Sequence, residues 1–334
     1  MRISALFALL FLFACSAEAP VETVLTGHTM GTQYNVKLRQ QDLDQAALQQ
    51  EIDGSLELVE EMMSTYRPGS EISRFNQSTT TDWHGVSAEF CESVEQALSL
   101  SSLTEGAFDI TVAPLVNLWG FGPDDMIDEP PTDAEISALM DTIGYEHLHT
   151  DCSLPALKKD IAELMLDMSA FGKGLAVDYL ADLLSGRGIE NYLVEVGGEM
   201  RLRGKNAKGE KWAIGIEMPV TDQRRPHTVV HLTDTALATS GDYRNFFEKD
   251  GQRYSHTIDT RTGRPVTHSL ASVTVVNGSG SRADALATAL LVMGPERGMD
   301  LAVRENLAVL FLLRDDSGID ERATPAFERL RSSG

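Results

Sequence analysis

The sequence predicts an α+β protein with a mixed, mostly antiparallel sheet and flanking helices. Short apolar or alternating runs of strand length gather in the second half of the chain. Other segments repeat apolar residues at helical spacing. No repeat of 20–50 residues and no low-complexity stretch is present, so a repeat architecture is excluded. With 334 residues the chain can form one large domain or two lobes, and a lobe boundary near residues 150–160 stays open.

Helices predominate in the first half, after one strand at residues 34–38 that follows from alternation. Leu48, Ile52 and Leu56 begin an apolar stripe at helical spacing. Ser87 is typical of a helix cap, and Thr132 with Glu135 matches a capping box. We therefore expect helices over residues 43–63, 87–106 and 132–144.

The second half alternates strands with two helices. The strands are expected at residues 161–167, 192–196, 212–218, 229–232, 271–276 and 308–313. The helices are expected at residues 175–184, closed by Gly186, and at 283–293, closed by Gly294 and Pro295.

The charge balance and the lengths of the apolar runs each exclude one class of protein. Lys and Arg number 28 against 50 Asp and Glu, which gives a net charge of −22. Such a surface repels a phosphate backbone, so no nucleic-acid partner is expected. After the first residues no apolar run approaches the roughly 20 needed to span a bilayer, which excludes a polytopic membrane protein.

The N-terminus indicates export. Arg2 precedes an apolar run over residues 3–13, and Ala14 and Cys15 follow, as in a signal peptide. Residues 12–15 also resemble a bacterial lipobox, in which Cys15 becomes the lipidated first residue; plain secretion with an incidental Cys is the alternative. We expect a signal peptide at 1–14, a lipidated N-terminus and tether at 15–26, and an anchor in the bacterial cell envelope facing the periplasm, with the inner membrane favoured.

Two further cysteines, Cys91 and Cys152, have two open interpretations. An oxidising periplasm permits a disulfide between them, and two buried free thiols are an equal alternative. No Cys-x-x-Cys is present, so the spacing typical of a zinc site is missing.

Residues 281–288 combine a carboxylate and a hydroxyl that suit a metal. Asp284 and Thr288 are four residues apart near the start of an expected helix, so they share one face. Such oxygens suit Mg²⁺, which retains waters or phosphates as its other ligands. The alternative is that Ser281 and Asp284 form a capping box and serve only the helix.

Three other segments carry candidate chemistry, although no G-x-G-x-x-G, Walker A, G-x-S-x-G or H-E-x-x-H motif is present. At residues 166–174 a strand is expected to end at Asp167 and a helix to begin after Gly172. Lys173 at this junction can reach a phosphate; the alternative is a purely structural strand–loop–helix connection with a Gly turn. His256, expected in a short strand before the turn at 262–265, suits a general base or a structural hydrogen bond. Phe108 and Trp119 can stack on a flat ring or pack in the core.

Together these segments resemble the FAD:protein FMN transferase family, often called ApbE, from about residue 24 to residue 314. Nine motifs occur in the order of the family: G-H-T-M-G-T (27–32), S-T-Y-R-P-G-S (64–70), S-R-F-N (73–76), G-A-F-D-I-T-V-A-P-L-V-N-L-W-G-F-G (106–122), L-D-M-S-A-F-G-K-G (166–174), V-G-G-E (196–199), A-T-S-G-D-Y-R-N (238–245), S-H-T-I-D-T-R-T-G-R-P (255–265) and A-D-A-L-A-T-A-L (283–290). The resemblance implies a T-fold-like domain over residues 27–330.

The resemblance also implies an activity and a site. Members bind FAD with Mg²⁺ and move its FMN moiety onto a Thr or Ser hydroxyl of an acceptor protein, releasing AMP. The base that takes the hydroxyl proton corresponds to His256. The FAD positions correspond to Met30, Tyr66, Ala107, Phe108, Asp109, Asp167, Lys173 and Ile258. The metal positions correspond to Ala170 through its carbonyl, Asp284 and Thr288.

Two positions depart from some relatives, and other activities stay open. Ala287 replaces an acidic residue of certain members, and Lys173 stands where some carry Glu. The alternatives to transfer are hydrolysis of FAD to FMN and AMP, and a non-catalytic FAD-binding lipoprotein. The expected acceptor is a subunit of a membrane electron-transfer or sodium-pumping complex.

Overall fold

The computed structural model describes residues 22–40, 43–123, 127, 129–220, 225–243, 245–315 and 318–332. The predicted signal peptide and lipidated Cys15 lie outside these residues. Residues 22–26, which we expected in the tether, belong instead to the first strand. Within the described part, no helix has both the length and the apolar character needed to cross a membrane.

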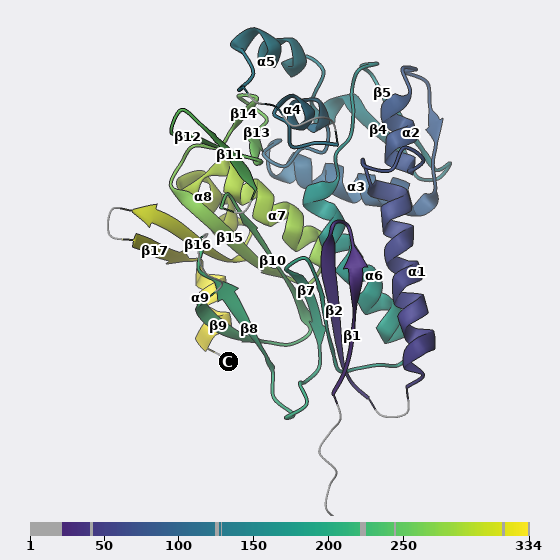
Figure 1. Cartoon of the computed structure of the whole chain (residues 1–334), viewed down its shortest axis with the longest axis vertical. Helices are drawn as coiled ribbons and strands as arrows, with labels where there is room; N and C mark the ends of the chain where they lie inside the picture. Colours follow the sequence, from purple (N-terminus) through teal and green to yellow (C-terminus); the bar gives the residue numbers. More distant parts are fainter. Residues whose placement is uncertain are drawn as a thin grey trace, which may run out of the picture.

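An eight-stranded antiparallel sheet forms the centre of the molecule, in the order β1-β2-β6-β7-β10-β15-β16-β17 (Figure 1). Neighbouring strands are antiparallel throughout, as predicted. The sheet contains strands that precede residues 150–160 in the sequence and strands that follow them, so a lobe boundary at that segment does not divide the sheet. The strands are β1 (Glu22–Thr29), β2 (Thr32–Arg39), β6 (Tyr192–Val196), β7 (Glu199–Arg203), β10 (Thr235–Gly241), β15 (Leu270–Asn277), β16 (Ala308–Asp315) and β17 (Gly318–Ala323).

The sequence pattern of each strand follows its position in the sheet. β6 alternates buried and half-buried residues, because one face meets the helices and the other is less covered. In β15 every residue from Leu270 to Val276 is buried, since both faces are covered there. Its apolar run is therefore continuous.

The helices α1 (Gln45–Met63), α6 (Ser169–Gly186) and α7 (Gly280–Met293) lie side by side along the sheet (Figure 1). α6 and α7 touch through two glycines. A Cβ on Gly174 would lie 2.3 Å from the carbonyl oxygen of Gly280, and one on Gly280 would lie 2.5 Å from that of Gly174. α6 begins at Ser169, earlier than the predicted residue 175. The G-K-G segment lies within the helix, and its second glycine, Gly174, allows the close crossing with α7.

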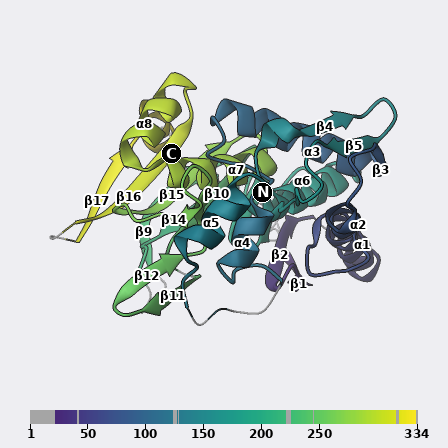
Figure 2. The ribbon, with the colours of Figure 1, turned by 90° about the horizontal axis from the view of Figure 1, so that it is seen from above.

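The remaining helices and strands surround this centre. The helices are α2 (Glu71–Gln77), α3 (Ala88–Leu103), α4 (Ala113–Leu118), α5 (Asp133–Met140), α8 (Pro295–Arg304) and α9 (Pro325–Ser332), with a 3-10 turn at Tyr145–His147. The other strands form small antiparallel sheets. One sheet contains β3 (His84–Gly85), β4 (Leu148–Asp151) and β5 (Ala156–Lys159). The others are pairs: β8 (Trp212–Glu217) with β9 (Pro226–Leu232), β11 (Phe246–Lys249) with β12 (Gln252–Ser255), and β13 (Ile258–Asp259) with β14 (Arg264–Pro265). In Figure 2, α8 and β17 lie on the opposite side of the molecule from α1.

The predicted strand at residues 161–167 is wrong. The segment is irregular apart from a single bridge between Val112 and Met165. Leu164 and Leu166 are buried, but side chains take the place of a neighbouring strand. The Asn76 amide donates to the Leu166 carbonyl over 2.8 Å and accepts from its N–H over 2.7 Å. Lys159 Nζ donates to the carbonyl of Leu164 over 2.9 Å. The buried apolar residues that predicted a strand therefore do not pair in a sheet.

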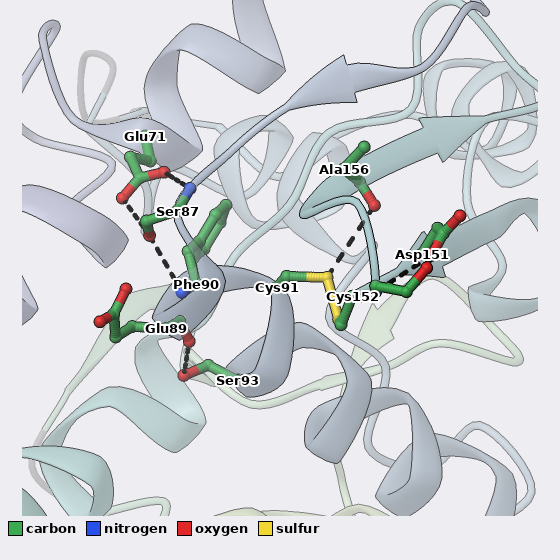
Figure 3. The surroundings of a disulfide bond; sticks show 10 residues. Glu71, Ser87, Glu89, Phe90, Cys91, Ser93, Asp151, Cys152 and Ala156 are labelled. Atoms are coloured by element: carbon green, nitrogen blue, oxygen red, sulfur yellow. Dashed lines mark hydrogen bonds between the residues drawn. A yellow bond between two sulfur atoms is a disulfide. The ribbon is translucent and has the colours of Figure 1, made fainter.

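The two cysteines form a disulfide (Figure 3). Cys91 on α3 is bonded to Cys152, just after β4, with Cα atoms 5.6 Å apart and a sequence separation of 61. Ser87 caps α3 as predicted, accepting from the N–H of Phe90 over 3.1 Å. The disulfide decides between the two alternatives that the sequence left open.

Candidate active site

A cavity of about 470 Å³ gathers nearly all of the predicted site residues. Its walls come from α6, α7, the start of β7, the end of β10, β8 and the segment that follows β12. The predicted residues that line it are Tyr66, Ala107, Phe108, Asp109, Asp167, Ala170, Lys173, His256, Ile258, Asp284 and Thr288. Segments more than 200 residues apart therefore contribute to one site.

Met30 does not line this cavity. It lies in the two-residue turn between β1 and β2 with φ +49°, followed by Gly31 with φ +68°, as in a tight hairpin turn. Its N–H donates to Glu60 Oε1 over 2.8 Å. The structure thus gives Met30 a place in a hairpin turn and does not bring it into contact with the cavity.

Asp284 and Thr288 lie on one face of α7, as predicted. The cap of α7 is Ser279, whose hydroxyl accepts from the N–H of Arg282 over 3.2 Å, so the proposed capping box of Ser281 with Asp284 is not formed. Asp284 is instead buried against α6, where its Oδ2 accepts from the N–H of Gly174 over 3.0 Å. The Thr288 hydroxyl is hydrogen-bonded to that of Ser240 over 2.9 Å.

The oxygens around Asp284 suit a hard cation. In an ideal helix the N–H of Gly174 donates to the carbonyl of Ala170. Here the N–H of Gly174 donates to Asp284, so the first turn of α6, which includes the Ala170 carbonyl, lies against the Asp284 carboxylate. A carboxylate, a hydroxyl and a carbonyl are oxygen donors, and Mg²⁺ is often held by one or two carboxylates with water and phosphate completing the shell. Among the described residues no group of three or more His, Cys, Asp or Glu could hold a metal, so a cage of protein carboxylates is not the arrangement here.

Lys173 lies between two buried carboxylates. Its Nζ is 3.4 Å from Glu199 Oε1 and 4.0 Å from Asp284 Oδ2. Burial alone would lower the pKa of Lys173, but the negative charges of Asp284 and Glu199 raise it above its usual value. Burial raises the pKa of both carboxyls, and the nearby ammonium opposes that shift. Lys173 therefore remains a cation at neutral pH.

His256 follows β12 rather than lying in a strand as expected. Its Nδ1 lies 3.0 Å from the backbone carbonyl of Asn245, and because a carbonyl only accepts, Nδ1 carries the proton. The unprotonated Nε2 is then free to accept one. Burial, with a further contribution from Lys173, lowers the pKa of His256. The side chain is therefore neutral at neutral pH, as a base requires.

The segment 106–109 forms an apolar wall and is held by hydrogen bonds. Ala107 and Phe108 are buried in the core as well as lining the cavity. Asp109 accepts from the Thr111 N–H over 2.8 Å and the Tyr145 N–H over 3.0 Å, so its carboxylate also fixes the local loop. Trp119 packs in the core against Tyr254, and its indole N–H donates to the carbonyl of Gly263 over 2.8 Å. Packing is thus the role of Trp119.

Two further predicted residues, Tyr66 and Asp167, line the cavity. Tyr66 is 69% exposed, so its ring is available to a ligand at the opening. The Asp167 carboxylate accepts from the N–H of Ser169 over 2.7 Å at the start of α6. The Ser169 hydroxyl donates to the same carboxylate. Tyr66 and Asp167 both line the cavity, so both can contact a ligand bound there.

The comparisons with known proteins show which family the chain is part of. The model of the ApbE family matches residues 30–311. The chain belongs to the ApbE family. A relative from Vibrio cholerae named FAD:protein FMN transferase is 50% identical over 327 residues, which cover 97% of each chain. The solved flavin transferase ApbE from Vibrio cholerae has 48% identity and a TM-score of 0.86, covering 93% of this chain and 99% of that one. The apo flavinyl transferase ApbE of Pseudomonas stutzeri has 39% identity and a TM-score of 0.86, covering 94% and 98%.

This ApbE-family chain also places two residues in the cavity to which the sequence assigned no role. Glu199 and Ser240 line it and contact Lys173 and Thr288. Both lie in motifs of the family, V-G-G-E and A-T-S-G-D-Y-R-N. Their motifs were the available signal, but a Glu or Ser at a strand terminus has no chemical role until its neighbours are known.

Proposed function

We infer that this chain is an FAD:protein FMN transferase, which moves the FMN moiety of FAD onto an acceptor protein. The observation that carries the inference is the cavity itself, because it brings the base candidate His256 and the oxygens of Asp284 and Thr288 to one place. The identity of 50% with a relative of that name supports the same activity.

We propose that the acceptor is a Thr or Ser hydroxyl. The hydroxyl oxygen forms a bond to the phosphorus of the FMN moiety, the bond from that phosphorus to the bridging oxygen breaks, and AMP leaves with that oxygen. His256 Nε2 accepts the hydroxyl proton. The contact between Nδ1 and the Asn245 carbonyl supports this role, since it fixes both the ring and the tautomer.

A divalent cation, Mg²⁺, fits the oxygen donors of this cavity. Asp284, Thr288 and the carbonyl of Ala170 would hold it, and when bound it neutralises charge on a diphosphate. Lys173 adds a second positive charge beside Asp284. We propose that the diphosphate of FAD binds near these groups.

The flavin half of FAD needs flat apolar contacts. Ala107, Phe108 and Ile258 supply them within the cavity, and Tyr66 supplies an exposed aromatic ring at its edge. Asp109 and Asp167 complete the proposed FAD contacts, and Met30 is proposed from the family resemblance alone. Cys15 is proposed as a lipid anchor that holds the enzyme at the periplasmic face of the inner membrane, beside an acceptor subunit of a membrane electron-transfer or sodium-pumping complex.

The test is a reaction of the purified protein with FAD, Mg²⁺ and a candidate acceptor domain. Mass spectrometry should find the mass of one FMN on a Thr or Ser of the acceptor, with AMP released in equal amount. Steady AMP release without an acceptor would instead indicate FAD hydrolysis. Stoichiometric FAD binding with no turnover would indicate a binding protein, which the named relatives do not favour.

A further inference from the structure

Three charged side chains from three elements meet in the cavity. Glu199 begins β7, Lys173 lies in the first turns of α6, and Asp284 lies on α7. The Lys173 ammonium is 3.4 Å from a Glu199 oxygen and 4.0 Å from an Asp284 oxygen. Both carboxylates are almost fully buried, with 4% and 2% of their surface exposed. The Lys173 ammonium therefore lies between two buried carboxyl groups.

A divalent cation bound to Asp284 would lie close to the Lys173 ammonium, so the two cations would compete for this carboxylate. Like charges repel strongly at this separation, because a buried site screens them poorly. A divalent cation on Asp284 therefore binds more tightly when the ammonium lies farther away. The Lys173 side chain passes close to the backbone of Gly197, where a Cβ would come within 3.2 Å of its Cδ. A second partner close to Lys173 would hold its ammonium away from Asp284.

Glu199 provides that partner. Its Oε2 is buried, lies in the cavity wall and makes no hydrogen bond. A buried carboxylate oxygen without a partner costs free energy, and an ammonium has three donors to offer. We propose that Glu199 is a positioning residue for the cation site: it draws the Lys173 ammonium away from Asp284 and leaves Asp284 free to bind a divalent cation.

The proposal rests on the proposed function in one respect, the assignment of Asp284 as a cation ligand. It differs from a direct role, in which Glu199 would itself bind the cation. The two roles separate when Lys173 is removed. A positioning residue then has nothing to position, whereas a ligand keeps its full effect. A double-mutant cycle measures this difference.

The experiment titrates Mn²⁺ into the protein without FAD or acceptor and follows free Mn²⁺ by electron paramagnetic resonance. The variants are Glu199→Gln, Lys173→Met and the double variant, with folding checked by circular dichroism. We expect Glu199→Gln to weaken Mn²⁺ binding about tenfold, because the ammonium then stays on Asp284. Lys173→Met should bind Mn²⁺ at least as tightly as the wild type, and the double variant should match Lys173→Met.

Other results overturn the proposal. Wild-type affinity in Glu199→Gln shows that Glu199 has no influence on the site. Weaker binding by the double variant than by Lys173→Met shows that Glu199 is itself a ligand. If Glu199→Gln does not fold, Lys173→Met alone decides, since weaker binding in that variant contradicts competition. A wild type that takes up no Mn²⁺ removes the cation site from the proposed function as well, an outcome distinct from the others.

Discussion

The ring Nδ1 of His256 lies 3.0 Å from the backbone carbonyl of Asn245, and this carbonyl also accepts the backbone N–H of His256 over 3.1 Å. Two bonds to one oxygen fix the ring relative to its own backbone. They also place the proton on Nδ1 and leave Nε2 as the atom that can accept one. The first two predictions follow from this arrangement.

Replacing His256 should slow transfer while FAD binding persists. A general base contributes about 10²–10⁴-fold to a rate, so His256→Gln should reduce the rate of FMN transfer within that range. Single-turnover kinetics with saturating FAD would measure the rate, and flavin fluorescence would measure binding. Loss of FAD affinity with an unchanged transfer rate would contradict the assignment.

The rate of transfer should depend on pH below the usual range of histidine. Burial lowers the pKa of His256, and only its neutral form accepts a proton. The rate should therefore remain level through neutral pH and fall only as the pH drops below about 6.5, the usual value. A pH profile of kcat/KM for the acceptor would show this limb, and a decline that begins above pH 7 would refute it.

Removing the charge of Asp284 should impair transfer without unfolding the protein. Asp284→Asn keeps an oxygen for the N–H of Gly174, so the contact between α6 and α7 persists. The loss of a charge that holds a cation at the reacting phosphate should reduce transfer by about 10²–10³-fold. Rates should be compared over a series of Mg²⁺ concentrations with Tm as the control. Wild-type rates at low Mg²⁺ would remove Asp284 from the site.

The glycine contact between α6 and α7 gives a stability prediction. Gly174→Ala would place a Cβ 2.3 Å from the Gly280 carbonyl oxygen, and both partners are backbone, so the helices must separate. We expect a loss of about 1–3 kcal/mol in the free energy of unfolding. Gly172→Ala is the matched control in the same helix, since nothing lies within 4 Å of its Cβ; it should be neutral or gain about 0.5–1 kcal/mol. Equal effects in urea denaturation would contradict this explanation.

The disulfide should stabilise the part of the protein that carries α3 and β4. It joins cysteines with a sequence separation of 61, and cross-links of this kind typically contribute about 2–4 kcal/mol. Dithiothreitol should therefore lower the Tm of the wild type. A Cys91→Ala, Cys152→Ala double variant should start at the lower Tm and show no response to the reductant. A response to dithiothreitol in that variant would show that another effect is being measured.

The secondary structure was predicted correctly where buried residues recur at the spacing of a helix or of a strand. The stripe of α1 and the alternation of β6 are read directly from apolar spacing, because each has one buried face. The prediction failed at residues 161–167, where Asn76 and Lys159 satisfy the backbone from elsewhere. The predicted start of α6 was also too late in the sequence. Gly174 weakens an isolated helix, but it is required where α6 touches α7.

Residue type and order by themselves determined the chemistry of this protein: an acidic chain with nine family motifs, a histidine that can serve as a base, and a carboxylate four residues before a hydroxyl on one helix. Tertiary structure alone decided which of these groups meet. It set Asp284 against α6 and placed Lys173 between two carboxylates, left Met30 in a hairpin turn and joined the cysteines. Spacing along a chain fixes only neighbours within one element, whereas distances between elements depend on how closely their backbones pack.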